Sequence, residues 1–296
     1  MFANRIPLMC IAICGVVFYH LAFLGIHIGR LNIGYAGVDI FMLLSGYGIA
    51  NSLSRNSLKQ FYRNRAKRLL PLWIVTCVIC QFVKLGGVNL LGLVSDITTF
   101  SFYVNPDSVP EWYLQTLILF YIVSPLLKFI IDRIGWLFVI IISILIVGYC
   151  TFIPLYHWQY ANAIPRFSLF VLGMTCFIRN RPNLPYSITV PLFLLGIAFF
   201  FRNSHYLFSS LCIPFVMQVI NILIDRRTIP TVVNWIGNHT LEIYVADIIA
   251  TETLQPIMTG LPILTKIAVR LTMIVALTLL FNQMEKIYEK IPTIHH

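Results

Sequence analysis

A histidine and an aspartate stand inside the first two apolar stretches of the chain. His20 lies seven residues before His27, where we expect the first connecting loop to begin, and Asp39 lies five residues after Gly34, where we expect it to end. In an antiparallel helical hairpin with a rise of ~1.5 Å per residue, the two side chains lie at about the same depth. A histidine that is oriented and made more basic by a carboxylate can act as a general base. A polar pair that simply joins two helices is an equally good interpretation of these two residues.

A basic segment, residues 54–68, follows the second apolar stretch and is closed by Pro71. Its cations include Lys59, Arg63, Arg65, Lys67 and Arg68. Such clusters commonly bind anionic lipid headgroups, and composition alone favours this interpretation. The alternative is a cytoplasmic site for a phosphorylated ligand, because the forked guanidinium of arginine suits phosphate.

A third group of polar residues lies further along the chain. Glu111, Trp112 and Tyr113 stand at the end of an apolar stretch, where Trp and Tyr usually anchor a helix in the membrane interface. Arg166 follows Pro165 inside another stretch and needs an acidic or phosphate partner, because an ionisable residue within a membrane is costly. Candidate partners are Glu242 and Asp247. With Tyr244 they lie in a later apolar stretch, residues 233–250.

The elements that position these residues follow from composition. The 296 residues are 58% hydrophobic and 11% charged, with a mean hydropathy of +0.83. Soluble domains carry roughly 25% charged residues, so this chain must use lipid as its outer solvent. Continuous apolar runs such as Trp136–Cys150 exclude the alternating pattern of a membrane barrel. We therefore expect an all-α, polytopic membrane bundle.

About ten spans of ~20 residues are expected. Their ranges are 6–26, 35–53, 70–88, 112–131, 135–154, 163–178, 187–202, 206–224, 233–250 and 262–283. We also expect a short interfacial helix within 89–111 and a single domain over residues 1–296. With both termini in the cytoplasm, most of the 21 Lys and Arg residues fall inside. This topology accounts for the net charge of +10, so we expect no nucleic-acid partner.

The cysteines and the N-terminus suggest no further chemistry. Cys77 and Cys80 form a C-x-x-C pair on an expected span, where cysteine usually acts as a small hydrophobe. We therefore predict no redox or metal site. The first span is full-length and lacks an A-x-A-like cleavage site, so we expect no removable signal peptide.

Three sequence blocks in the first third of the chain form a recognisable series. They are Val16-Val17-Phe18-Tyr19-His20, then Gly37-Val38-Asp39-Ile40-Phe41-Met42-Leu43-Leu44-Ser45-Gly46-Tyr47, and then Phe61-Tyr62-Arg63-Asn64-Arg65-Ala66-Lys67-Arg68-Leu69-Leu70-Pro71. Weaker matches follow at Trp112–Leu114, Arg166–Gly173 and Trp235–Tyr244. In order and spacing these blocks resemble the acyltransferase 3 family of membrane-bound bacterial acyltransferases, over nearly the whole chain.

The resemblance implies transfer of an acyl group, usually acetyl, from cytoplasmic acetyl-CoA to a hydroxyl of a surface or exported polysaccharide or its lipid-linked precursor. It implies that His20 is the catalytic base and Asp39 its orienting partner. Arg65 and Arg68, with Arg63, are expected at the phosphates of acetyl-CoA, and Ser45 beside its pantetheine arm. We assign acceptor binding to Glu111, Trp112, Tyr113 and Arg166. The expected location is the bacterial cytoplasmic membrane, with a carbohydrate acceptor and the lipid bilayer as partners.

Two positions depart from the family pattern. The family commonly has an arginine eleven positions before the histidine, where this chain has Met9, and Arg5 is the nearest arginine. The family often has a late histidine in the ninth span, where this chain has Asp247. A transporter, with Arg166 and Asp247 on a solute path, and a non-catalytic component of polysaccharide assembly are the competing interpretations. For the oligomeric state, a homodimer is one option.

Overall fold

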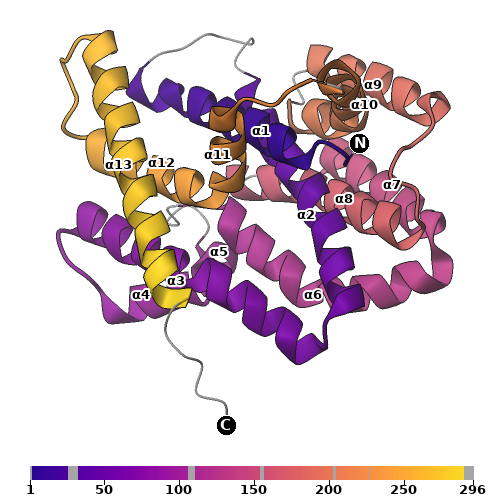
Figure 1. Ribbon diagram of the computed structural model, residues 1–296, viewed down its shortest axis with the longest axis horizontal. Coiled ribbons are helices and arrows are strands. Elements are labelled where there is room, and N and C mark those ends of the chain that lie inside the picture. The colour runs from indigo at the N-terminus through magenta and orange to yellow at the C-terminus, as the bar shows by residue number, and fades with distance from the viewer. Residues whose placement is uncertain are drawn as a thin grey trace.

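The computed structural model describes residues 2–25, 33–105, 111–153, 157–202, 205–225 and 227–289. All regular structure in these ranges is helical, which confirms the predicted fold class (Figure 1). The longer helices are α1 (Arg5–Tyr19), α2 (Gly37–Arg55), α3 (Leu58–Leu85), α6 (Tyr113–Ile134), α7 (Trp136–Phe152), α8 (Trp158–Ile178), α9 (Tyr186–Phe201), α10 (His205–Ile224), α12 (Thr240–Leu254) and α13 (Ile263–Glu289). The shorter ones are η1 (His20–Leu24), η3 (Gly34–Ala36), α4 (Leu90–Ile97), α5 (Phe100–Val104) and α11 (Thr231–Asn238).

Seven of the described helical segments are long and apolar enough to cross a membrane. They are Arg5–Leu24, Gly34–Arg55, Leu58–Lys84, Tyr113–Ile134, Trp158–Ile178, Leu207–Ile224 and Ile263–Lys286. Two shorter apolar helices, α7 and α9, match two more of the expected spans. The molecule is therefore a polytopic membrane bundle. The expected first loop, with His27, lies outside the described residues.

The basic segment is the first half of a membrane helix, where we had expected a separate segment that ends at Pro71. α3 is continuous from Leu58 to Leu85, with Pro71 inside it. Ser57 begins the helix by accepting a hydrogen bond from the backbone N–H of Gln60. A proline removes one helical hydrogen bond, and membrane helices tolerate this where neighbouring groups satisfy the backbone. The arginines are therefore held on a helix that also spans the membrane.

The expected ninth span is divided into two helices. α11 ends at Asn238 and α12 begins at Thr240, with His239 between them. The ring of His239 stacks on Trp235, and its Nδ1 lies 2.8 Å from the Trp235 carbonyl oxygen. These local contacts stabilise the break between the two helices. As a result, α12 starts inside the protein instead of at its surface.

Close helix crossings hold the N-terminal half together. A Cβ atom at Gly46 of α2 would lie 2.0 Å from the carbonyl oxygen of Phe170 on α8, and one at Gly173 would lie 2.1 Å from that of Leu43. Only glycine fits at such a crossing, which is the small-residue packing typical of membrane helices. In Figure 1, α13 lies beside α12 at one edge, and α9 and α10 form the opposite edge.

The predicted short helix between the third and fourth spans is present as α4 and α5. Asn89 begins α4 by accepting a hydrogen bond from the N–H of Leu91 at 3.1 Å. The indole N–H of Trp73 on α3 donates to the carbonyl of Ile97 at 3.2 Å. Leu90 and Leu91 are exposed, so α4 presents an apolar face outward. This is the behaviour of a helix at the membrane interface.

Candidate active site

His20 lies where the first helix changes from an α-helix to a 3-10 helix. α1 ends at Tyr19, and the 3-10 helix η1 begins at His20. His20 Nδ1 lies 2.6 Å from Asp247 Oδ2 on α12. Arg270 on α13 donates from Nη2 to the other oxygen of Asp247 at 2.5 Å, and to Thr251 Oγ1 at 2.9 Å. One buried carboxylate therefore joins the histidine to a buried guanidinium.

This contact selects the ring nitrogen of His20 that can act on a substrate. When Nδ1–H donates to Asp247, the neutral ring carries its lone pair on Nε2. The side chain of His20 is 13% exposed, whereas Asp247 is 0% exposed. Arg270, also 0% exposed, supplies the counter-charge that a buried carboxylate requires. Asp247 thus orients His20, whose side chain keeps partial exposure, as a general base requires.

The sequence predicted that His20 pairs with Asp39. In the structure His20 pairs with Asp247 instead. Depth fixes how far along a helix a side chain lies, but not which way it points. Gly37 faces α1, because a Cβ there would lie 2.2 Å from the carbonyl oxygen of Ala12. At ~100° per residue, Asp39 is turned about 200° from Gly37 and points away from α1.

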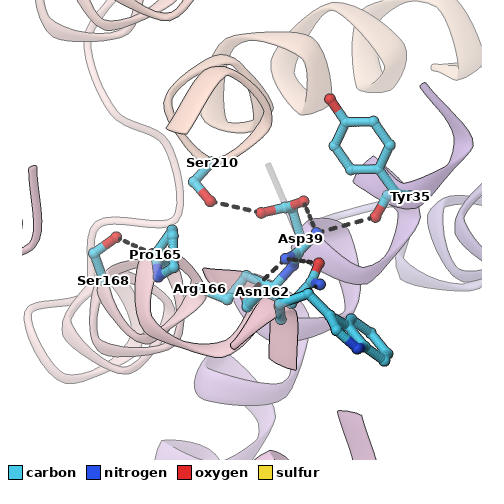
Figure 2. Close-up of polar contacts among 8 residues, drawn as sticks. Tyr35, Asp39, Asn162, Pro165, Arg166, Ser168 and Ser210 are labelled. Carbon is cyan, nitrogen blue, oxygen red and sulfur yellow. Dashed lines mark hydrogen bonds and ion pairs between the residues drawn. The ribbon is translucent and has the colours of Figure 1, made fainter. Parts of the chain in front are cut away.

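Asp39 belongs to a separate buried cluster with Arg166 (Figure 2). Arg166 Nη2 lies 3.1 Å from Asp39 Oδ2, and the hydroxyl of Ser210 donates to Asp39 Oδ1 at 2.7 Å. Arg166 also donates to the carbonyl oxygens of Tyr35 at 3.3 Å and Asn162 at 2.7 Å. The acidic partner that Arg166 was predicted to need is therefore Asp39. It is neither Glu242 nor Asp247, the two candidates taken from the sequence. Asp39 and Arg166 are both 0% exposed and together join α2, α8 and α10.

A basic cavity of about 270 Å³ opens between α1, α2, α3, α6 and the start of α12. Arg5, Arg65 and Arg68 line it. The described residues around the cavity include no Asp or Glu, so the three guanidinium groups give it a positive charge. Arg65 Nε is buried and has no hydrogen-bond partner. An unpaired buried donor in a basic cavity is suited to an anionic ligand.

The cavity contains most of the predicted donor-binding residues. Arg65, Arg68 and Ser45 line it, together with Tyr113, which we had assigned to the acceptor. Arg63 is exposed on α3 and is not among the lining residues. Arg5 lines the cavity beside Met9, the position where the family commonly has arginine. Arg5 and position 9 therefore border the same cavity.

Glu111 and Trp112, predicted to bind the acceptor, hold the start of α6. Glu111 is 3% exposed and accepts hydrogen bonds from the backbone N–H groups of Tyr113 and Leu114, both at 2.6 Å. It also accepts one from the hydroxyl of Tyr244, which lines the basic cavity. Trp112 lies under Arg166, with 5.0 Å between the guanidinium carbon and the ring centroid. Their role at an acceptor stays a prediction.

Helix α12 connects the basic cavity to His20. Thr240 and Tyr244 in its first turns line the cavity, and Asp247, three residues further on, holds His20. The same helix therefore borders the cavity at Tyr244 and holds His20 through Asp247, three residues further on.

Asp247 and Arg270 are the two site residues to which sequence reasoning gave no role beside His20. Both are ionisable residues inside apolar helices, which is the signal that marks functional positions in membranes. Asp247 also stands where the family often has a histidine. Both observations marked Asp247 as a candidate functional residue. Its partners could not be predicted, because they depend on tertiary packing.

Comparisons with known proteins identify the family. The family described as an acyltransferase domain matches residues 9–282. A Staphylococcus aureus (strain COL) protein, provisionally named an O-acetyltransferase, is 34% identical over 107 residues, 33% of this chain and 17% of its own length. The O-acetyltransferase OatA of S. aureus (strain NCTC 8325) is 29% identical over 117 residues, 36% of this chain and 18% of its own. The match thus spans under a fifth of each relative's length, and no solved structure matches. The chain belongs to the acyltransferase 3 family of membrane-bound acyltransferases.

Proposed function

We propose that this protein is an O-acetyltransferase that moves acetyl from cytoplasmic acetyl-CoA to a hydroxyl of a surface or exported polysaccharide, or of its lipid-linked precursor. The observation that carries the proposal is the placement of His20. Its anchor, Asp247, lies on α12 three residues beyond Tyr244, which lines a cavity with three arginines. We assign the whole activity to one membrane domain of the bacterial cytoplasmic membrane.

The basic cavity is suited to the donor. Coenzyme A carries several phosphates, and Arg5, Arg65 and Arg68 present guanidinium groups without acidic competitors among the lining residues. α12 begins at Thr240 in the cavity wall, so the positive end of its dipole also faces the cavity. Ser45 and Tyr113 line the space beyond the arginines, where the pantetheine arm would lead toward His20.

The chemistry is a direct acyl transfer. His20 Nε2 takes the proton of the acceptor hydroxyl while the hydroxyl oxygen attacks the thioester carbonyl. The new C–O bond forms, the C–S bond breaks, and the departing thiolate of coenzyme A takes the proton from His20. The products are an acetyl ester and a free thiol. Asp247 keeps the ring in the required tautomer and stabilises the positive charge that it carries between the two proton transfers.

The charge distribution supports transfer across the bilayer. Arg65 and Arg68 lie in the half of α3 that begins at Leu58, which the excess of Lys and Arg places in the cytoplasm. His20 lies at the opposite end of α1 from Arg5. A donor held at the arginines and a base near the outer face let the acetyl group cross without the coenzyme.

A transfer assay tests this function. Membranes that contain the full-length chain are incubated with labelled acetyl-CoA and envelope glycans of the producing cell. Wild type should label the glycan, and His20→Ala should lose the label by about 100-fold or more. His157→Ala, which replaces a histidine that contacts Tyr160 at the start of α8, should keep it. Equal labelling by wild type and His20→Ala would contradict the proposal.

A further inference from the structure

A second cavity, of about 330 Å³, lies where the far half of α3 meets α4 and α5. Its polar lining residues are Gln81, Lys84, Ser95, Asp96, Ser101 and Asn105. Amide, hydroxyl, ammonium and carboxylate groups therefore surround one space. This mixture both donates and accepts hydrogen bonds, as a ligand with many hydroxyl groups requires.

The floor of this cavity holds an unpaired polar atom. Gln81 donates from Nε2 to Asp96 Oδ2 at 2.9 Å, and both residues are 8% exposed. The Oε1 atom of Gln81 is buried and has no hydrogen-bond partner. A buried acceptor without a donor is unfavourable, so a ligand that donates to this oxygen is stabilised there.

The cavity lies on the far side of His20 from the arginines. Lys84 in its wall pairs with Glu252 on α12 at 3.5 Å. Glu252 lies five residues after Asp247, which is ~7.5 Å along the helix. Along α12 the order is therefore basic cavity, anchor of His20, and second cavity.

The rim of the cavity carries exposed apolar side chains. Phe100 and Val104 line the cavity and are 60% and 65% exposed, and Leu91 on α4 is 84% exposed. On α3, Gln81 lies ~20 Å beyond Arg68, at the opposite end of the helix from its basic half. The cavity thus combines buried polar groups with an exposed apolar rim, a combination that suits the membrane interface.

We propose that this second cavity binds a glycosyl group of the acceptor, with Gln81 and Asp96 as hydrogen-bonding partners of its hydroxyls. The inference rests on the proposed function and adds to it the place where the acceptor binds. A soluble polysaccharide and a lipid-linked precursor present the same glycosyl chemistry. The apolar rim offers the lipid-linked form an additional contact.

Kinetics with Gln81→Leu give the first test. The probes are oligosaccharides released from the envelope of the producing cell and the lipid-linked precursor fraction of the same cells. We expect the half-saturating glycan concentration to rise about tenfold, with the value for acetyl-CoA unchanged. Gln60→Leu is the matched control, because Gln60 is an exposed glutamine on the same helix that bonds Asn64. An unchanged half-saturating glycan concentration in Gln81→Leu would overturn the proposal.

Cysteine protection tests binding without turnover. In Ser95→Cys, a membrane-impermeant maleimide added outside should label the cavity, and the glycan fractions should slow the labelling. Protection by the lipid-linked fraction alone would identify it as the source. If neither fraction protects, the cavity holds water only and the proposal fails. If a fraction protects while wild type transfers no acetyl group, the cavity assignment stands and the proposed function fails.

Discussion

His20 Nδ1 and Asp247 Oδ2 lie 2.6 Å apart, although 227 positions separate the two residues in the chain. The contact joins the end of α1 to the middle of α12, and α12 also forms part of the basic cavity. The histidine is therefore oriented by the same helix that borders the basic cavity. If His20 is the base, its orientation and the donor's position are set together.

Replacing Asp247 by asparagine should lower the rate of acetyl transfer about 100-fold or more, because the neutral amide does not stabilise a protonated His20. Asp39→Asn is the matched change in a carboxylate that does not contact His20, and its turnover should stay within a few-fold of wild type. The measurement is turnover at saturating acetyl-CoA and glycan. A larger loss in Asp39→Asn would restore Asp39 as the orienting residue.

Asp247→Asn also leaves Arg270 buried without a counter-charge, which costs about 3–5 kcal/mol where a buried pair is broken. The double change Asp247→Asn with Arg270→Leu removes both charges. We expect it to recover most of the thermal stability but none of the activity. Recovery of activity together with stability would show that Asp247 acts only in folding.

Breaking the second buried pair should affect stability more than turnover. Arg166→Met leaves Asp39 buried and unpaired, and should destabilise the protein by about 3–5 kcal/mol. Arg166→Met with Asp39→Leu removes both charges and should recover stability. Thermal unfolding in detergent measures both variants. If the double variant folds stably but has lost acceptor affinity, Arg166 binds the acceptor as the sequence predicted.

The three cavity arginines should each contribute to donor affinity. Arg5→Ala, Arg65→Ala and Arg68→Ala each remove a charge-assisted contact and should raise the Kd of coenzyme A about tenfold. Arg63→Ala is the control on the same helix and should leave the Kd unchanged. Because Met9 lines the same cavity, Met9→Arg should restore affinity in Arg5→Met. Calorimetry checks all six variants. An unchanged Kd in the first three would return the basic segment, residues 54–68, to a lipid-anchoring role.

The crossing of α2 and α8 should tolerate no side chain. Gly46→Ala places a Cβ 2.0 Å from a backbone oxygen, so the helices must separate. We expect a loss of about 1–3 kcal/mol, measured by unfolding in detergent. Gly148→Ala on α7 meets no atom within 4 Å and is the matched control. Equal stability of the two variants would show that the helices are not held at this distance.

The sequence predicted the features that depend on composition and depth. Apolar runs located the helices, and an ionisable residue inside such a run marked His20, Arg166 and Asp247 in advance. The pairing of these residues could not be predicted, because the direction of a side chain around its helix depends on which neighbours the helix meets. Asp39 and His20 were predicted to lie at the same depth, yet Gly37 shows that Asp39 points away from the first helix.

The two corrected helix boundaries have a similar cause. Pro71 was expected to end a segment, but α3 continues through it because the surrounding helices supply the packing. The break at His239 has no proline or glycine directly at it and is held by stacking on Trp235. Neither the continuation of the helix through Pro71 nor the stacking of His239 on Trp235 can be predicted from the local sequence.

The most direct test of the central claim is acetyl transfer across a sealed bilayer. Full-length protein is reconstituted in vesicles with labelled acetyl-CoA on the side of Arg65 and Arg68, and with envelope glycan on the side of His20. Wild type and His157→Ala should acetylate the glycan, and His20→Ala should not. Equal transfer by His20→Ala, or transfer only when donor and glycan share one side, would contradict the account.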